Sequence, residues 1–295
     1  MSPDGRRPVR FVGRGFSRAT TAYALLLVLV AGTVFAQTTP ARIVSLIPAV
    51  TEMLFAIGAG DRVVGVSTFD TFPAETATRT KVGGLFDPNF EAILTLRPDL
   101  VVVYGSQEEL IGRLDRVKIP MFSYRHAGLA DITGTIRALG IRVSRTARAE
   151  ALATRIEREL DAVRLSVAGR PRPRTLLVFG REEGSMRGLY VSGGVGFLHD
   201  MLEVAGGVNV MADVKREGLQ LPLEQLLARA PEVVIELRAS EKWDAGRVAR
   251  EAVVWRSVAV PAARNNRVRF LPDESLTIPG PRVAAAVRLI AGALR

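Results

Sequence analysis

One segment near the middle of the chain restricts the folds that this sequence can adopt. Residues 144–168 contain neither glycine nor proline, and their apolar residues recur in steps of three and four, as on one face of an α-helix. The segment predicts one helix that is about 37 Å long. Gly169 can end this helix, and Pro171 and Pro173 prevent its continuation. The apolar positions are Ala149, Leu152, Ala153, Ile156, Leu160, Val163 and Val167.

Strand-like and helical patterns alternate on both sides of this helix. Short apolar runs rich in β-branched residues are separated by helical stretches, which is typical of α/β units with mostly parallel sheets. We therefore predict an α/β fold in which one lobe (residues 37–143) and a second lobe (residues 169–295) are joined by the single long helix. The predicted strands cover residues 43–46, 63–66, 100–104, 175–179, 233–237 and 268–271.

The two predicted lobes repeat one motif. In each lobe a glutamate is followed seven residues later by a proline, then by an acidic residue and an apolar run: Glu91 to Pro98, and Glu224 to Pro231. Such a proline ends a helix and lets a strand follow. This αβ connection is common, but its recurrence in the same order favours two structurally related halves around one helix.

The N-terminus has the three parts of a secretory signal. Basic residues up to Arg18 precede an apolar run over residues 22–31, and small residues lead to a predicted cleavage site after Ala36. The apolar run is shorter than the ~20 residues that span a bilayer, although an uncleaved anchor helix is an alternative. Arg6 and Arg7 leave open whether export uses the general or the twin-arginine route.

The chain contains no cysteine. This composition excludes disulfides, thiolate metal sites and a lipid-modified N-terminal cysteine, so we expect residues 1–36 to be removed and the mature protein to lie in the periplasm. Without those residues the net charge falls from +10 to +6, from 35 basic and 29 acidic side chains. The arginines are dispersed and form no basic stripe with interleaved aromatics, so no nucleic-acid partner is expected.

Several motifs resemble the periplasmic binding proteins for cobalamin, ferric siderophores and haem. They are RIVSLIPAVTEMLFAIG (42–58), KVGG (81–84), NFEAILTLRPDL (89–100) and LEVAGGVN (202–209). The resemblance spans about residues 42–291 and is closest to the cobalamin-binding members. It implies two α/β lobes joined by one long helix. It also implies a monomeric, non-enzymatic component of an ABC importer, without an intrinsic cofactor, that delivers a corrinoid to a permease in the inner membrane.

The resemblance also gives roles to the two repeated glutamates. In such binding proteins one exposed glutamate on each lobe docks with arginines of the permease, and Glu91 and Glu224 match those positions. Charges on separate lobes can report the position of one lobe relative to the other. The alternative is that each carboxylate only interacts with its helix dipole, which contributes ~0.3–1 kcal/mol. We expect both side chains to be exposed.

We expect the ligand cleft between the lobes, at loops where strands end. Aromatic side chains follow several predicted strands and would suit a large, flat ligand. Phe72, Tyr104 and Tyr190 match aromatic cleft positions of the cobalamin-binding members. Arg125 can pair with a carboxylate or phosphate on a ligand. The candidate ligand-binding residues are Phe69, Phe72, Phe86, Tyr104, Tyr124, Arg125, His126 and Tyr190.

Some positions depart from the cobalamin-binding pattern. Leu85 and Gly218 stand where tryptophans are expected, and Glu274 and Ile278 replace a polar pair near the last loop. These departures keep a ferric siderophore or haem as the alternative ligand. A histidine can ligate a haem iron or the cobalt of a corrinoid, and a tyrosinate can hold ferric haem. His126 is the candidate axial ligand, and the alternative is that it only forms hydrogen bonds at its loop.

Two other classes of function stay open at this stage. An exported hydrolase is the enzymatic alternative, but the chain contains neither a G-x-S-x-G elbow nor an H-E-x-x-H zinc motif. A sensor that docks a receptor instead of a permease would share every feature described above.

Overall fold

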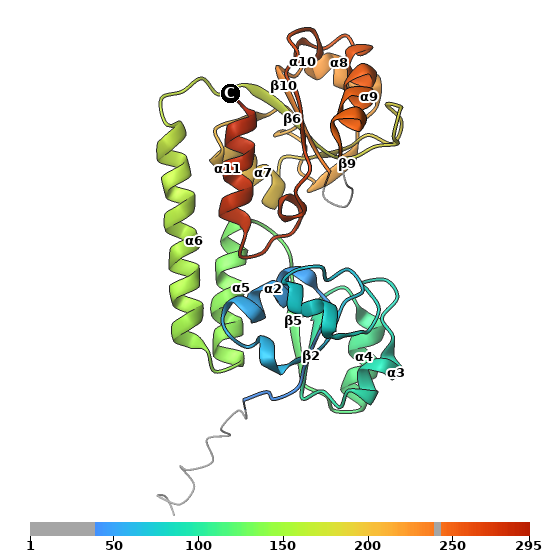
Figure 1. Ribbon diagram of the computed structural model, residues 1–295, viewed down its shortest axis with the longest axis vertical. Helices are drawn as coiled ribbons and strands as arrows, with labels where there is room; N and C mark the ends of the chain where they lie inside the picture. The colour runs from blue at the N-terminus through green and yellow to red at the C-terminus, as the bar shows by residue number, and fades with distance from the viewer. Residues whose placement is uncertain (1–38, 239–242) are drawn as a thin grey trace, which may run out of the picture. The chain divides into compact units, whose positions relative to one another are not determined.

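Two β-sheets organise the part of the chain that the structure describes. The computed structural model describes residues 39–238 and 243–295 (Figure 1). Residues 39–295 form one compact unit, and none of its described helices is long and apolar enough to cross a membrane. The export signal predicted over residues 1–36 lies outside the described residues.

The N-terminal lobe, residues 39–142, contains a sheet that is parallel throughout, in the order β3-β2-β1-β4-β5. Its central strands β1 (Ile43–Ser45) and β4 (Leu100–Tyr104) are almost entirely buried, as is typical of a parallel sheet covered on both faces. The other elements of this lobe are β2 (Val63–Val66), β3 (Thr80–Lys81), β5 (Met121–Tyr124), α2 (Pro48–Ala56), α3 (Phe90–Thr95), α4 (Glu108–Arg116), α5 (Leu129–Arg142) and the 3-10 turns η1 (Gly60–Arg62) and η2 (Ala74–Thr78).

The C-terminal lobe, from residue 174 onward, contains a mixed sheet in the order β11-β10-β6-β7-β9, with β8 paired to β6. Strands β6, β8, β10 and β11 run parallel to one another, whereas β7 runs antiparallel to both β6 and β9. The elements are β6 (Arg174–Gly180), β7 (Tyr190–Ser192), α7 (Phe197–Val204), β8 (Val208–Asn209), β9 (Gly218–Gln220), α8 (Leu223–Arg229), β10 (Val233–Leu237), α9 (Ala245–Arg256), α10 (Pro261–Arg264), β11 (Val268–Leu271), η3 (Glu274–Thr277) and α11 (Val283–Ala293).

These sheets confirm the predicted α/β fold. All six predicted strands are present within one residue of their predicted ends. The hairpin-like strands β7 and β9 were not among them, because each has only three residues and shows little alternation of apolar and polar side chains.

The long helix is α6 (Thr146–Val167), and Gly169 follows it with a left-handed φ of 74°. Figure 1 shows α6 beside α5 over one half of its length and beside α11 over the other, and both pairs are in contact. Helix α5 was not predicted, since glycines interrupt its pattern. One of them, Gly140, allows close packing: a Cβ there would lie 2.2 Å from the Cβ of Ala149 on α6.

The repeated motif corresponds to repeated hydrogen bonding. The residues before the two prolines, Arg97 and Ala230, both adopt left-handed backbone conformations, with φ of 46° and 45°. The acidic residue after each proline then accepts backbone N–H groups at the start of a neighbouring strand. Asp99 accepts from Ala41 and Arg42 at 2.8 Å, just before β1. Glu232 accepts from Arg174, the first residue of β6, at 2.9 Å. The two lobes therefore share a local construction as well as a sequence pattern.

One carboxylate in the N-terminal lobe is buried with little to stabilise its negative charge. Asp70 follows β2 and is 4% exposed, and neither of its carboxylate oxygens has a hydrogen-bond partner within hydrogen-bonding geometry in the described chain. Burial raises its pKa from an ordinary 3.8 to about 7, and the nearby Thr51 and Lys81 offset only part of this shift.

This burial predicts a pH-dependent stability. Because the folded protein holds a proton on Asp70 that the unfolded chain releases, the free energy of unfolding should fall as the pH rises from about 4 to about 7, and then level off. Three pKa units correspond to a loss of roughly 4 kcal/mol at most. Urea unfolding at pH 5 and pH 8 should show a smaller loss for Asp70→Asn than for the wild type. The exposed Asp61 provides the control, Asp61→Asn, and equal losses for all three proteins would contradict the prediction.

Candidate ligand-binding cleft

Three adjoining cavities share His126 as a lining residue; two are lined by both lobes and the third by the N-terminal lobe alone. Their volumes are about 340, 310 and 230 Å³. The residues around them follow β1, β4, β5 and β11 or end β6, so both sheets present strand ends to the same space. Ligands of α/β proteins commonly bind at such strand ends.

The N-terminal lobe contributes two tyrosines and the histidine. Tyr104 and Tyr124 end the adjacent strands β4 and β5 in direct register, and their rings meet edge to face at 5.5 Å. His126 comes two residues after β5, and its Nδ1 lies 3.4 Å from the Tyr124 hydroxyl. The predicted residues Tyr104, Tyr124 and His126 therefore form one cluster.

The C-terminal lobe covers this cluster with apolar side chains. Phe197 begins α7, and its ring lies edge-on to His126 at 5.0 Å. The loop Thr277 to Pro279 lines the largest of the three cavities from the side of η3. Phe179, at the end of β6, lines the smallest together with Gly218. The cluster is thus closed by aromatic and aliphatic groups.

Burial keeps the imidazole of His126 and the hydroxyls of Tyr104 and Tyr124 uncharged at neutral pH. It lowers the pKa of His126, which the Glu217 carboxylate opposes only in part. It raises the pKa of both Tyr104 and Tyr124. The cleft therefore offers a neutral imidazole and two phenolic hydroxyls that can donate or accept hydrogen bonds.

The other predicted ligand-binding residues lie outside the cluster or at its edge. Arg125 is exposed and lines the 310 Å³ cavity. Tyr190 packs against Phe179 at 6.3 Å, one ring away from the cavities. Phe72 lies under the guanidinium group of Arg282 in the C-terminal lobe. The remaining two are highly exposed, Phe69 at 67% and Phe86 at 94%, and Phe86 lines a separate cavity beside α4.

The sequence did not identify the covering residues. Phe179, Phe197 and the loop from Thr277 to Pro279 come from segments that lie more than 50 residues from His126, and only the packing of the lobes brings them together. The sequence holds a partial indication of these covering residues. Gly218 and Ile278 depart from the cobalamin-binding pattern, and each lines one of the cavities.

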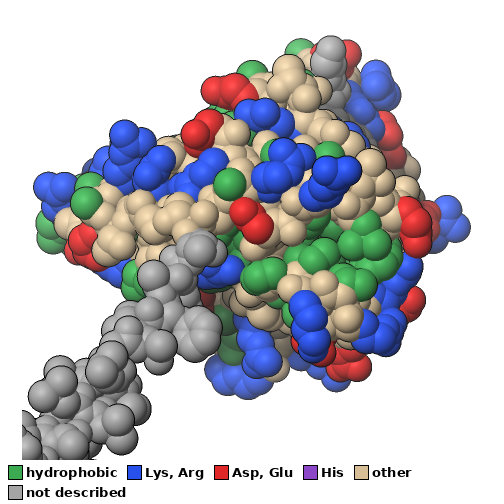
Figure 2. All heavy atoms as spheres, turned by 90° about the horizontal axis from the view of Figure 1, so that it is seen from below, with side chains coloured by type: hydrophobic (Ala, Val, Ile, Leu, Met, Phe, Trp, Pro, Cys, Tyr) green, Lys and Arg blue, Asp and Glu red, His purple; other side chains and the backbone are tan. Residues whose placement is uncertain are grey.

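The repeated glutamates lie in equivalent places. Glu91 is in the first turn of α3 and Glu224 in the first turn of α8, and both are exposed. Glu91 forms a surface ion pair with Arg113 at 3.0 Å. Figure 2 shows the molecule from below the view of Figure 1; on the face seen there, basic side chains are spread among acidic and hydrophobic ones.

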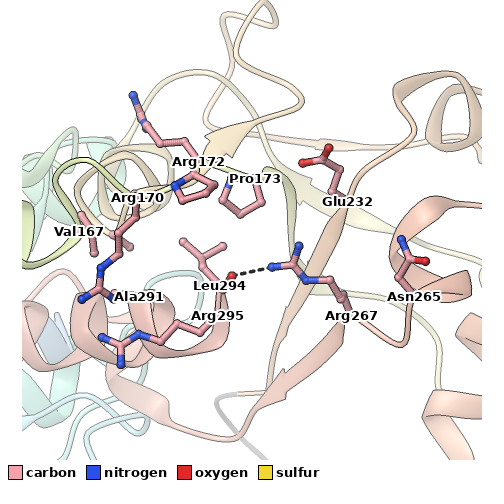
Figure 3. Close-up of a pocket in the computed structure, with 13 residues that line it drawn as sticks. Val167, Arg170, Arg172, Pro173, Glu232, Asn265, Arg267, Ala291, Leu294 and Arg295 are labelled. Atoms are coloured by element: carbon pink, nitrogen blue, oxygen red, sulfur yellow. Dashed lines mark hydrogen bonds between the residues drawn. The ribbon is translucent and has the colours of Figure 1, made fainter.

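A larger cavity, of about 700 Å³, lies away from this cleft (Figure 3). It is near the start of β6 and the end of α11, and none of the predicted ligand-binding residues lines it. Arginines surround it, but Arg172 already pairs with Glu203 and Arg267 donates to the Leu294 carbonyl. We interpret it as a solvated basic surface.

Comparisons with known proteins agree with this geometry. The Vitamin B12-binding protein of Salmonella paratyphi A is 32% identical over 196 residues, which cover 66% of this chain and 71% of that protein. The periplasmic heme-binding protein RhuT from Roseiflexus sp. RS-1 is 26% identical, with a TM-score of 0.72 over 86% of this chain and 97% of its own.

The periplasmic Vitamin B12 binding protein BtuF of Vibrio cholerae has the same fold. Its TM-score is 0.74 at 24% identity, over 87% of this chain and 97% of its own. The model of the periplasmic binding protein family matches residues 43–275. Because this match covers most of the chain, the protein belongs to the periplasmic binding protein family.

Proposed function

We propose that this chain is the periplasmic substrate-binding component of an ABC importer and that it captures a corrinoid, cobalamin-like ligand between its lobes. The observation that carries the proposal is the aromatic cluster around His126, which both lobes build. Flat apolar faces with a few polar handles suit a large macrocycle. The relative from Salmonella paratyphi A, named for vitamin B12 binding, supports the same ligand class.

The missing tryptophan at position 218 has a structural substitute. A Cβ on Gly218 would lie 2.8 Å from the Phe179 ring, so that ring occupies the space into which a side chain at 218 would grow. Phe179 can therefore supply an aromatic face close to where the resemblance leads one to expect a tryptophan. This substitution favours keeping the corrinoid as the first candidate.

The alternative ligand is haem or a ferric siderophore. The observation that favours it is the Tyr124 and His126 pair, because a neutral imidazole is the form that binds iron. The 26% identity to a heme-binding protein supports it as well. Haem or a ferric siderophore would use the same cleft, and His126 could ligate the iron of haem.

The remaining parts of the proposal concern location and partners. Binding without catalysis fits the family, and an exported hydrolase is the less favoured class. The mature chain would begin after residue 36, work as a periplasmic monomer without an intrinsic cofactor, and deliver its ligand to an inner-membrane permease.

Titration with candidate ligands tests the ligand class. The mature protein should bind cyanocobalamin with a Kd below about 10 μM, followed by visible absorbance and calorimetry, and haemin and a ferric hydroxamate should bind more weakly. Phe197→Ala should weaken binding at least tenfold, about 1.4 kcal/mol, because it removes a ring that closes the cleft.

Leu165→Ala is the control, since Leu165 is 77% exposed on α6 and lies outside the three cavities. Its affinity should equal that of the wild type. Failure to bind cyanocobalamin below about 10 μM would reject the corrinoid, and tight haemin binding in the same titration would establish the alternative.

The permease contact rests on Glu91 and Glu224. Each glutamate is exposed in the first turn of a helix on a different lobe, and each is the first residue of the repeated motif. The ion pair of Glu91 with Arg113 is at the surface and contributes little to stability, so a permease arginine could replace Arg113 at low cost.

Replacing both glutamates by alanine should abolish ligand uptake in cells that carry only the variant, and leave ligand affinity unchanged in vitro. Glu75→Ala is the control, because Glu75 is also exposed in the first turn of a helical segment, η2, but lacks the motif. Normal uptake by the double variant would refute the docking assignment.

A further inference from the structure

A buried glutamate of the N-terminal lobe has its partner in the other lobe. Glu52 on α2 is 3% exposed, and burial raises its pKa despite that partner. Both of its carboxylate oxygens accept from Arg282: Oε2 from Nε at 3.0 Å and Oε1 from Nη2 at 2.6 Å. Such a bidentate pair is strong and directional, and removing Arg282 would leave the buried carboxylate of Glu52 uncompensated.

Arg282 also contacts Glu274 and Phe72, and Glu274 in turn contacts Thr71. Its Nη1 lies 3.1 Å from Oε1 of Glu274, whose Oε2 accepts from the Thr71 hydroxyl at 2.9 Å. The guanidinium group lies over the Phe72 ring, 4.1 Å from its centroid, in cation–π geometry. We call these five residues the interlobe latch: Glu52, Thr71 and Phe72 from the N-terminal lobe, and Glu274 and Arg282 from the C-terminal lobe.

The latch lies directly beside the ligand cleft. Glu274 and Arg282 flank the segment from Thr277 to Pro279, which lines the 340 Å³ cavity together with Pro48 and Ala49 of α2. The loop also approaches Glu52 through its backbone, because a Cβ on Gly280 would lie 3.2 Å from Oε2 of Glu52. The ion pair therefore connects two walls of one cavity.

We propose that Glu52 and Arg282 are positioning residues that hold this loop against α2 and keep the lobes of the empty protein close together. With the latch formed, the loop from Thr277 to Pro279 and Ala49 of α2 are held as two walls of the 340 Å³ cavity. Opening of the latch moves these walls apart, so a formed latch slows the escape of a ligand held between them. This inference rests on the proposed function of the cleft as the ligand site.

The absence of cysteine from the chain makes the interlobe distance measurable. Arg116 at the end of α4 and Ser257 after α9 are both exposed, so Arg116→Cys and Ser257→Cys add two specific spin-label sites, one on each lobe. Electron double resonance on the ligand-free protein then reports the distance between the lobes. This readout needs no knowledge of the ligand.

Glu52→Gln and Arg282→Gln should each shift the distance distribution to longer and broader values. Thr71→Val and Glu274→Gln, in the more exposed part of the latch, provide milder variants if the buried ones fold poorly, and should give a smaller shift in the same direction. Arg288→Gln is the matched control, because Arg288 lies on the same helix and pairs with Glu159 of α6 at an exposed position. It should leave the distribution unchanged.

The kinetic arm uses cyanocobalamin or haemin, whichever the wild type binds. Glu52→Gln should release it at least about tenfold faster, because loss of one partner of a buried charge pair acts mainly on dissociation. Folded latch variants with wild-type distances and wild-type release would overturn the proposal. If neither probe binds the wild type, the proposed ligand class fails, whereas the distance measurement still decides the latch.

Discussion

The packing of α6 against α5 over one half of its length and against α11 over the other is the interaction on which the arrangement of the lobes depends. The stripe that includes Ile156 and Leu160 is buried, and each fully buried side chain of this size contributes about 1.5–3 kcal/mol. Helices α5 and α11 belong to different lobes, so one continuous apolar surface connects both. The solvent-accessible ion pairs of Arg137 on α5 with Glu150 and Glu157 on α6 orient the two helices but contribute little to stability. Movement of the lobes is therefore restricted to what this helical contact tolerates.

Buried charges are compensated differently in the two lobes. In the C-terminal lobe Arg181 is fully buried, but Glu236 and Glu251 of the same lobe pair with it at 3.1 and 2.5 Å. In the N-terminal lobe the buried Glu52 pairs with an arginine across the cleft, and Asp70 is left with a raised pKa. The N-terminal lobe is thus electrostatically incomplete by itself. Desolvating a carboxylate is costly, so this incompleteness favours the closed arrangement in which Arg282 is within reach.

Hydrophobic periodicity accounts for what the sequence predicted well. The strands and α6 have uninterrupted patterns. Tyr104, Tyr124 and His126 lie together because the strand ends of one parallel sheet meet at one edge. Helix α5 was not predicted because glycine has a low helix propensity. Gly140 permits close packing of α5 on α6, which the helical pattern does not reveal. The pair of Glu52 and Arg282 joins residues 230 positions apart. No local pattern reveals such a pair, because its reason to exist is the desolvation that only the assembled lobes create.

The repeated αβ unit connects the cleft to the outer surface. Asp99 and Glu232 accept backbone hydrogen bonds at the starts of β1 and β6. These bonds hold the segments that follow α3 and α8, so each helix is tied to its own sheet. Glu91 and Glu224 begin these helices. Any change in the distance between the lobes must therefore change the separation of the two carboxylates. Under the proposed docking, a permease that contacts both glutamates would distinguish a latched from an unlatched protein through geometry alone, without contacting the ligand.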